Sequence, residues 1–193
     1  AKTLTQEQLT TIASADQTAE PLFLRAILEE LVVFGKFEEL DKRIQELLSC
    51  PSVVDVYTYK IDRLQQAVDD VDQVAEVLSF MWVSRAGVSA EELQGLAGMK
   101  GDDFERIYRA LDGFLMNRTG FLDFVDPTLR EAVQVVFLDH RSKIKEFRRR
   151  LARYLEERYQ PDEERYSEVA WQYSQAGDDA KLLGCITNPT AFS

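Results

Sequence analysis

The chain has 193 residues, of which 45% are apolar and 30% are charged, and its formal net charge is −11. These proportions are typical of a globular protein, and no run of about 18 apolar residues is present that could span a bilayer. The negative charge disfavours nucleic acid as a partner, because Lys and Arg side chains that neutralise phosphates supply most of that affinity. The acidity is concentrated in residues 1–138, since residues 139–193 carry equal numbers of acidic and basic side chains.

The two cysteines, Cys50 and Cys185, lie far apart in sequence and have no His or Cys neighbour at metal-ligand spacing. We expect them to be free, buried thiols rather than a disulfide, which indicates a reducing compartment and a cytoplasmic protein. No charged segment precedes a short apolar stretch, so no signal peptide is predicted. The first residue is Ala1, and we expect a fragment of a larger protein without membrane association.

Residues 1–70 predict a helical domain. Thr5 and Gln8 are spaced as a capping box that begins a short helix, and Pro21 suits the first turn of a second helix. The second helix is apolar enough to be buried on most sides, and Gly35 ends it. A third helix from about Phe37 stops at 49–51, and a fourth begins at Ser52. The acidic stretch 68–72 predicts a domain boundary.

Residues 71–139 predict a winged-helix domain. A helix is predicted over 74–82. Ser89 and Glu92 are spaced as a second capping box, in which each side chain bonds to the backbone of the other, and this predicts the start of another helix. Asp102 and Glu105 open a third helix that extends to about Leu115. Residues 115–124 alternate as two short strands around a glycine-containing turn, which predicts the wing. Asp126 and Pro127 then begin a closing helix, with the Asp at the cap and the Pro in the first turn.

Residues 140–193 predict a second helical domain. A long helix begins at about His140 and ends at Pro161, and a helical hairpin around Gly177 follows it. This tail is typical of the start of a helix-pair stack. The predicted fold class is therefore mainly α: a helical domain, a winged helix with a small β-hairpin, and a C-terminal helical hairpin that begins an α-solenoid.

A basic stripe recurs every four residues along the long helix, and it comprises Arg141, Lys145, Arg149 and Arg153. Lys143, Arg148 and Arg150 flank it. One interpretation is a surface for a polyanion, either nucleic acid or an acidic partner. The other is a solvated helix face, or a face that pairs with the acidic first domain. Both interpretations stay open from the sequence.

No motif of a catalytic or nucleotide-binding site is recognisable in the sequence. Gly35 and Lys36 do not form a P-loop, because Glu30 stands where the leading glycine should be and Phe37 where Ser or Thr should follow. His140 is the single histidine, which leaves no metal site and no Cys-His dyad, and we expect it on the surface. We therefore expect no catalytic residues, no metal and no cofactor in this chain by itself.

Four stretches, in linear order, resemble STAND-class signalling NTPases of the NACHT type, in the group that includes nephrocystin-3-like proteins. The stretches are 21–31 with 34–40, which resemble the first helical domain; 77–89 and 129–133, which resemble the entry and last helix of the winged helix; and 171–178, which resemble the segment before the repeats. The resemblance covers essentially the whole chain.

The resemblance implies a regulatory arm that closes over an upstream nucleotide-binding domain and moves in a nucleotide-dependent switch. The parent protein would bind ATP or ADP with Mg, carry downstream repeats and self-associate on activation. Pro21 matches the proline that packs near adenine, and Asp126 stands where the family has a histidine that reaches the ADP β-phosphate. A carboxylate cannot donate to a phosphate at pH 7, so Asp126 departs from the pattern. The ordinary interpretations are a first-turn proline and a helix cap.

Two alternatives to the switch remain. A winged-helix transcription regulator would read duplex DNA through the third helix, but Arg106 and Arg109 share that helix with several acidic side chains, which makes it a poor DNA reader. A scaffold whose nucleotide switch has decayed is the other alternative, and Asp126 favours it.

Overall fold

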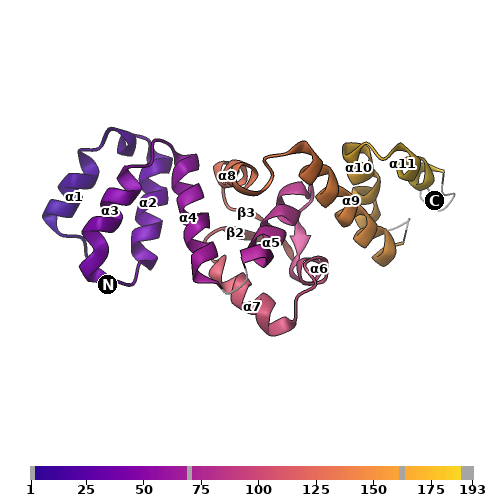
Figure 1. Ribbon diagram of the computed structural model, residues 1–193, viewed down its shortest axis with the longest axis horizontal. Helices are drawn as coiled ribbons and strands as arrows, with labels where there is room; N and C mark the ends of the chain where they lie inside the picture. Colours follow the sequence, from indigo (N-terminus) through magenta and orange to yellow (C-terminus); the bar gives the residue numbers. More distant parts are fainter. Residues whose placement is uncertain (1–2, 69–70, 161–163, 188–193) are drawn as a thin grey trace. The chain divides into compact units, whose positions relative to one another are not determined.

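A computed structural model describes residues 3–68, 71–160 and 164–187, without the side chains of Phe37 and Glu164 (Figure 1). The chain divides into two compact units, Ala1–Ala67 and Val68–Ser193. They are called unit 1 and unit 2, and each is described by itself. Asp69 and Asp70, in the middle of the predicted boundary, lie outside the described residues. The predicted domain ranges 1–70, 71–139 and 140–193 stay predictions.

Unit 1 consists of helices, several of which begin at a local capping residue or a proline. Its elements are α1 (Gln6–Ala13), η1 (Asp16–Ala19), α2 (Pro21–Val33), η2 (Phe37–Glu39), α3 (Leu40–Leu48) and α4 (Val53–Ala67). The Thr5–Gln8 capping box is confirmed, because both of its hydrogen bonds are present. Helix α2 packs against α3 and α4, and α1 packs against α3. The core between them is apolar and includes Phe23, Ile27, Ile44, Leu47, Tyr57 and Ile61.

The end of α2 departs from the prediction that this helix is buried on most sides. Val32 and Val33 are 73% and 74% exposed, while Leu31 and Phe34 beside them are buried. The apolar run is longer than the face that α3 and α4 cover, so its last residues point to solvent. The expectation that α2 is buried on most sides therefore holds for the body of the helix, and its last two residues are the exception.

The first part of unit 2 has the order of elements predicted for a winged helix. Its elements are α5 (Val71–Val83), β1 (Val88–Ser89), α6 (Ala90–Leu96), α7 (Gly101–Ala110), β2 (Leu115–Arg118), β3 (Phe121–Phe124) and α8 (Pro127–Phe137). The three strands form an antiparallel sheet in the order β1-β3-β2. Strand β1 was not predicted, because its two residues coincide with the start signal of α6, whose Ser89–Glu92 capping box is confirmed.

Helix α7 ends earlier than predicted. It starts at Gly101, so Asp102 lies in its first turn, and the preceding Lys100 makes no side-chain cap. It stops at Ala110, and Gly113 follows with a φ of +87°. That left-handed conformation favours glycine and turns the chain towards β2, so the helix does not reach Leu115.

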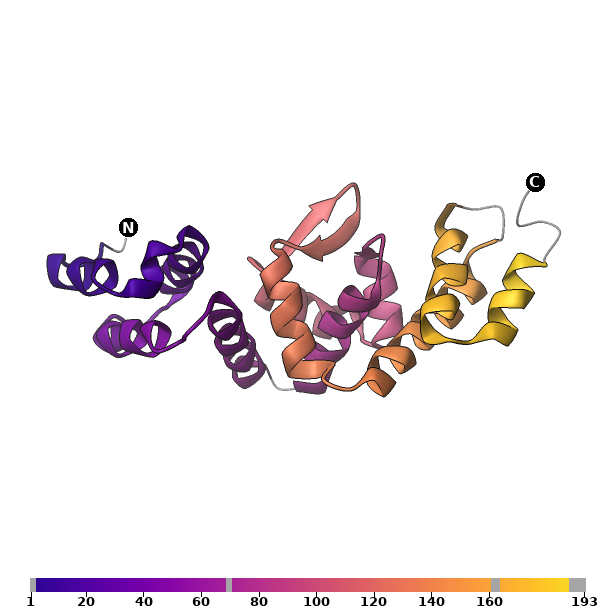
Figure 2. The ribbon, with the colours of Figure 1, turned by 90° about the horizontal axis from the view of Figure 1, so that it is seen from above.

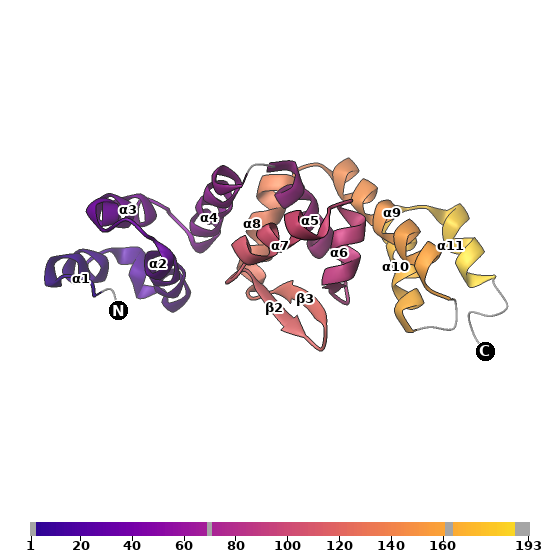
Figure 3. The ribbon, with the colours of Figure 1, turned by 90° about the horizontal axis from the view of Figure 1, so that it is seen from below.

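The β-hairpin is confirmed, and it forms the wing. Thr119 and Gly120 have φ values of +52° and +93°, which are the two left-handed residues of a type I′ turn. The Oδ1 atom of Asn117 accepts from the N–H of Gly120 at 2.9 Å and closes the turn. Leu122 and Phe124 are buried on the inner face, as the alternation predicted. Figures 2 and 3 show the hairpin extending from the helices of this part of unit 2.

The C-terminal helices of unit 2 are α9 (Arg141–Arg158), α10 (Ser167–Ala176) and α11 (Asp179–Ile186), with η3 (Glu164–Tyr166) before α10. Helix α9 packs against α10 and also against α5 and α6 of the winged-helix part. Gly177 ends α10 in the left-handed conformation, at φ 68° and ψ 37°. Pro161, the expected end of α9, lies outside the described residues. The predicted fold class, mainly helical with a small wing, is confirmed.

A buried polar joint as the candidate functional site

The two residues proposed by resemblance to contact nucleotide belong to different units. Pro21 is exposed at the first position of α2. Asp126 is 8% exposed and precedes α8, where its Oδ1 atom accepts from the N–H of Thr128 at 2.7 Å. Each residue therefore has a local role at a helix start, and the nucleotide role of both stays a prediction.

The predicted basic stripe divides along α9. Arg141 and Arg153 are exposed, and Lys145 is half-buried. Arg149 lies with its Nε 3.8 Å from Asp178 Oδ2 and donates to the carbonyl of Ala176, so it is partly engaged by the end of α10. The stripe is therefore not a uniform free surface, and its proposed role towards a polyanion stays a prediction.

The side chains of two flanking arginines of α9, Arg148 and Arg150, point towards other elements of unit 2. Arg148 Nη1 donates to the carbonyl of Val83 at 3.3 Å and to Gln172 Oε1 at 3.0 Å. Arg150 makes a two-pronged ion pair with Glu76 on α5, with one N–O distance of 2.7 Å, and lies over the rings of Phe80 and Phe147. The bond to Glu76 raises the pKa of Arg150. Helix α9 is thus fastened to α5.

Helix α10 is fastened to the end of α5 by Gln172 and Glu168, which are 0% and 1% exposed. Gln172 Nε2 donates to the carbonyl of Val83 at 2.7 Å and to Glu168 Oε1 at 2.8 Å. Glu168 Oε1 also accepts from the backbone N–H of Arg85 at 2.8 Å, and its Oε2 lies 3.4 Å from Arg85 Nε. These bonds satisfy backbone groups that α5 leaves open where it ends.

Aromatic rings cover this polar core. The guanidinium of Arg148 lies 4.8 Å from the Trp171 ring centroid and 5.9 Å from that of Trp82. Arg130 of α8 lies 5.6 Å from the Trp82 centroid and donates to the carbonyls of Trp82 and Ser84. Desolvation lowers the pKa of both arginines. The low dielectric that desolvation implies strengthens each of these hydrogen bonds.

A second cluster centres on Glu92, which is 1% exposed. Its Oε2 accepts from the N–H of Ser89 in the capping box, and Arg165 donates to both carboxylate oxygens at 2.9 Å. Tyr159 donates its hydroxyl to Oε1 at 3.0 Å, and burial together with this bond raises the pKa of Tyr159. Arg165 also lies 5.0 Å from the ring centroid of Phe121 on β3. The cap of α6 therefore anchors the segment before α10.

Together these two clusters form what we call the joint: Arg85, Glu92, Arg148, Arg165, Glu168 and Gln172, with the rings of Trp82 and Trp171. Breaking one partner of a buried ion pair costs about 3–5 kcal/mol, because it leaves an uncompensated charge. The geometry of the joint is therefore strongly specified. It offers no nucleophile or open substrate position, and what it can do is hold the winged-helix part and the C-terminal helices together.

Most residues of the joint were not predicted from the sequence to interact. Glu92 was expected only as a capping residue, and Arg148 only as a flank of the basic stripe. Arg165 and Glu168 carried no recognisable spacing. An arginine whose neighbours one turn away are apolar, as Arg148 is beside Ile144 and Leu151, was the one available signal that this side chain faces inward.

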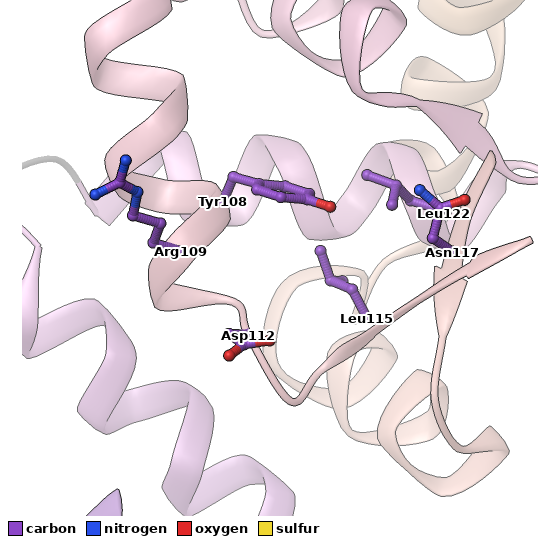
Figure 4. Close-up of a pocket in the computed structure, with 6 residues that line it drawn as sticks. All are labelled: Tyr108, Arg109, Asp112, Leu115, Asn117 and Leu122. Carbon is purple, nitrogen blue, oxygen red and sulfur yellow. The ribbon is translucent and has the colours of Figure 1, made fainter. Parts of the chain in front are cut away.

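A separate cavity of about 230 Å³ lies between α7 and the wing (Figure 4). It is lined by Tyr108, Arg109, Asp112, Leu115, Asn117 and Leu122. The cavity was not predicted, because Leu115, Asn117 and Leu122 were assigned only to the strands of the wing. It shares no residue with the joint.

Comparison with known proteins gives distant relatives. No family model matches the chain, and no solved structure matches it. The chain is 25% identical over 197 residues to the TPR repeat-containing protein DDB_G0287407 of Dictyostelium discoideum, covering 100% of this chain and 12% of that protein. It is 25% identical over 181 residues to nephrocystin-3 of Xenopus laevis, covering 89% of this chain and 14% of that protein.

The chain thus spans about one eighth of the length of the curated relatives it matches. In the part of the chain that the structure describes, none of the helices has the length and apolar character needed to cross a bilayer. The findings support a mainly helical chain with distant similarity to nephrocystin-3 and to a TPR repeat-containing protein.

Proposed function

We propose that this chain is a non-catalytic regulatory arm of a larger STAND-class NTPase of the NACHT type, in which unit 2 moves as one body. The joint is the observation that carries the proposal. It connects α9 and α10 to the end of α5, and η3 to the start of α6, through charged and amide groups, so a movement of one part of unit 2 acts on the other. An arm that relays a nucleotide-dependent movement needs this property.

The distant similarity to nephrocystin-3 and to a TPR repeat-containing protein supports the proposal at a coarser level, as a helical module for protein–protein interaction. The finer features come from resemblance. They are an upstream domain that binds ATP or ADP with Mg, downstream repeats of the same chain, self-association on activation and a cytoplasmic location.

Asp126 is the residue at which the nucleotide switch can be tested. Its Oδ1 atom caps α8, and a carboxylate repels phosphate. We expect calorimetry on a longer protein that includes the residues before Ala1 to detect ADP binding, and the Asp126→His variant to bind ADP more tightly. If neither protein binds ADP or ATP, the arm is a scaffold whose switch has decayed.

Reading of duplex DNA by α7 is the less favoured function. Arg106 lies 2.5 Å from Asp103, and Arg109 lies 3.8 Å from Glu105, so both arginines of this helix are paired along it. The acidic partners repel phosphates. Salt-dependent duplex binding by this chain at moderate ionic strength would favour the transcription-regulator alternative instead.

A further inference from the structure

Strand β2 has one free edge within the described residues, because the sheet order is β1-β3-β2. The N–H of Val125 donates to the carbonyl of Phe114 at 3.1 Å, and the register continues through Met116↔Asp123 and Arg118↔Phe121. In an antiparallel pair, alternate residues bond to the partner strand. The backbone N–H and C=O groups of Leu115 and Asn117 therefore point away from β3.

The cavity beside α7 opens along these same two residues. Leu115 and Asn117 share a face of the sheet with Leu122, which is 1% exposed, and all three line the cavity. Figure 4 shows the Tyr108 hydroxyl directed towards Asn117 and Leu122. A strand that paired with β2 would direct the side chains opposite Leu115 and Asn117 to this face, because side chains in directly opposed positions share a face.

The charged side chains that line the cavity are those of Arg109 and Asp112. Arg109 pairs with Glu105, and Figure 4 shows its guanidinium turned away from Leu115 and Leu122. Asp112 is exposed and has no ion pair among the residues that the structure describes. The unneutralised group at the rim is therefore a carboxylate.

We propose that the free edge of β2 takes up an extended, basic segment of a partner protein as a fourth strand, with a Lys or Arg side chain in the cavity. Backbone bonds to Leu115 and Asn117 would hold the segment, which is the principle of β-strand addition. The aliphatic stem of the basic side chain would lie on Leu115, Leu122 and the Tyr108 ring, and its charged head would reach Asp112.

The test uses this chain and two synthetic seven-residue peptides, identical and β-branched except for a central Lys or a central Glu. Amide hydrogen exchange is followed by NMR. In the free protein, we expect fast exchange at Leu115 and Asn117 and slow exchange at Met116 and Arg118. The Lys peptide is expected to protect Leu115 and Asn117, and the Glu peptide is not. Equal protection by both peptides would overturn the basic partner, and no protection by either would overturn strand addition.

Two matched variants locate the interaction. Asp112→Asn is expected to weaken binding of the Lys peptide about threefold, which is the range of an exposed ion pair, while Asp102→Asn, an exposed carboxylate of α7 outside the cavity, is expected to leave it unchanged. Equal effects of the two variants would contradict the assigned cavity. Protection of Leu115 and Asn117 that grows with protein concentration without peptide would show instead that two copies pair through β2.

Discussion

The side-chain amide of Gln172 on α10 lies 2.7 Å from the carbonyl oxygen of Val83, the last residue of α5. The two residues are 89 positions apart in sequence, and both are buried. Because this carbonyl lies at the end of a helix, it has no partner within α5, and Gln172 and Arg148 supply two donors to it. The C-terminal helices thus complete a hydrogen-bond pattern that α5 leaves open.

Removing Glu168 should destabilise unit 2 strongly. Glu168→Ala takes the acceptor away from the N–H of Arg85 and from Gln172 Nε2, and it removes the carboxylate beside the half-exposed Arg85 guanidinium. We expect the free energy of unfolding, measured with urea, to fall by about 3 kcal/mol, because buried donors lose a charged acceptor. Glu157→Ala, an exposed residue of α9, should change it by less than about 0.5 kcal/mol. Equal effects would show that the buried bonds of Glu168 contribute little.

Arg165 should not tolerate lysine. Its Nε and Nη2 atoms both donate to Glu92 at 2.9 Å, and one ammonium group cannot reproduce that fork. We expect Arg165→Lys to cost about 2 kcal/mol of unfolding free energy. Arg158→Lys provides the control, since Arg158 of α9 pairs at an exposed position with Glu91, the residue next to Glu92 in α6. Its cost should be much smaller, because the pair is exposed to solvent, and a similar cost for both variants would refute the distinction.

The packing of Tyr154 on α9 against α6 should require a glycine at position 95. A Cβ atom at Gly95 would lie 2.4 Å from the Tyr154 hydroxyl and 2.9–3.0 Å from its ring. We expect Gly95→Ala to lower the unfolding free energy, although alanine is the better helix former by about 1 kcal/mol. Gly184→Ala on α11 meets nothing within 4 Å and should stabilise the chain. In a Tyr154→Ala background, Gly95→Ala should become stabilising, and thermal unfolding of the wild type, the three single variants and the double variant measures this.

Alkaline pH should loosen the α10–α11 pair. Burial raises the pKa of Tyr166 to about 12, with a smaller contribution from its bond to Cys185. Since the folded-state pKa exceeds the unfolded value of 10.0, the stabilisation is complete below pH 10 and is lost as pH rises towards 12. The urea midpoint of the Tyr166→Phe variant should therefore fall less than that of the wild type between pH 9 and 11. A constant difference over this range would contradict the shift.

The sequence predicted those features that depend on residues close together in the chain. The Thr5–Gln8 and Ser89–Glu92 capping boxes, the Asp126–Pro127 helix start and the turn before Phe121 all follow from local backbone chemistry. Strand β1 escaped prediction because two residues carry no periodicity. The end of α7 was also misplaced, since the apolar pattern continues through Leu111 and Phe114, beyond Ala110, where the helix ends.

The joint could not be predicted, because its bonds to the end of α5 and the start of α6 join residues that are 65 to 89 positions apart. An arginine such as Arg148 is ordinarily exposed, and its burial is favourable here because it donates to Val83 and Gln172 and lies over the Trp171 ring. The cavity beside α7 was hidden for a similar reason. It depends on the distance between a helix end and a strand edge, which neither segment specifies by itself.

The central claim is that the winged-helix part and the C-terminal helices of unit 2 open as one body, and native-state amide hydrogen exchange in increasing urea tests it most directly. The central amides of α5, at Val77 and Leu78, are compared with those of α10, at Gln172 and Tyr173. The claim predicts that both sets report the same opening free energy and the same dependence on urea. Opening of α10 at a distinctly lower free energy, while α5 stays protected, would show that the joint does not couple them.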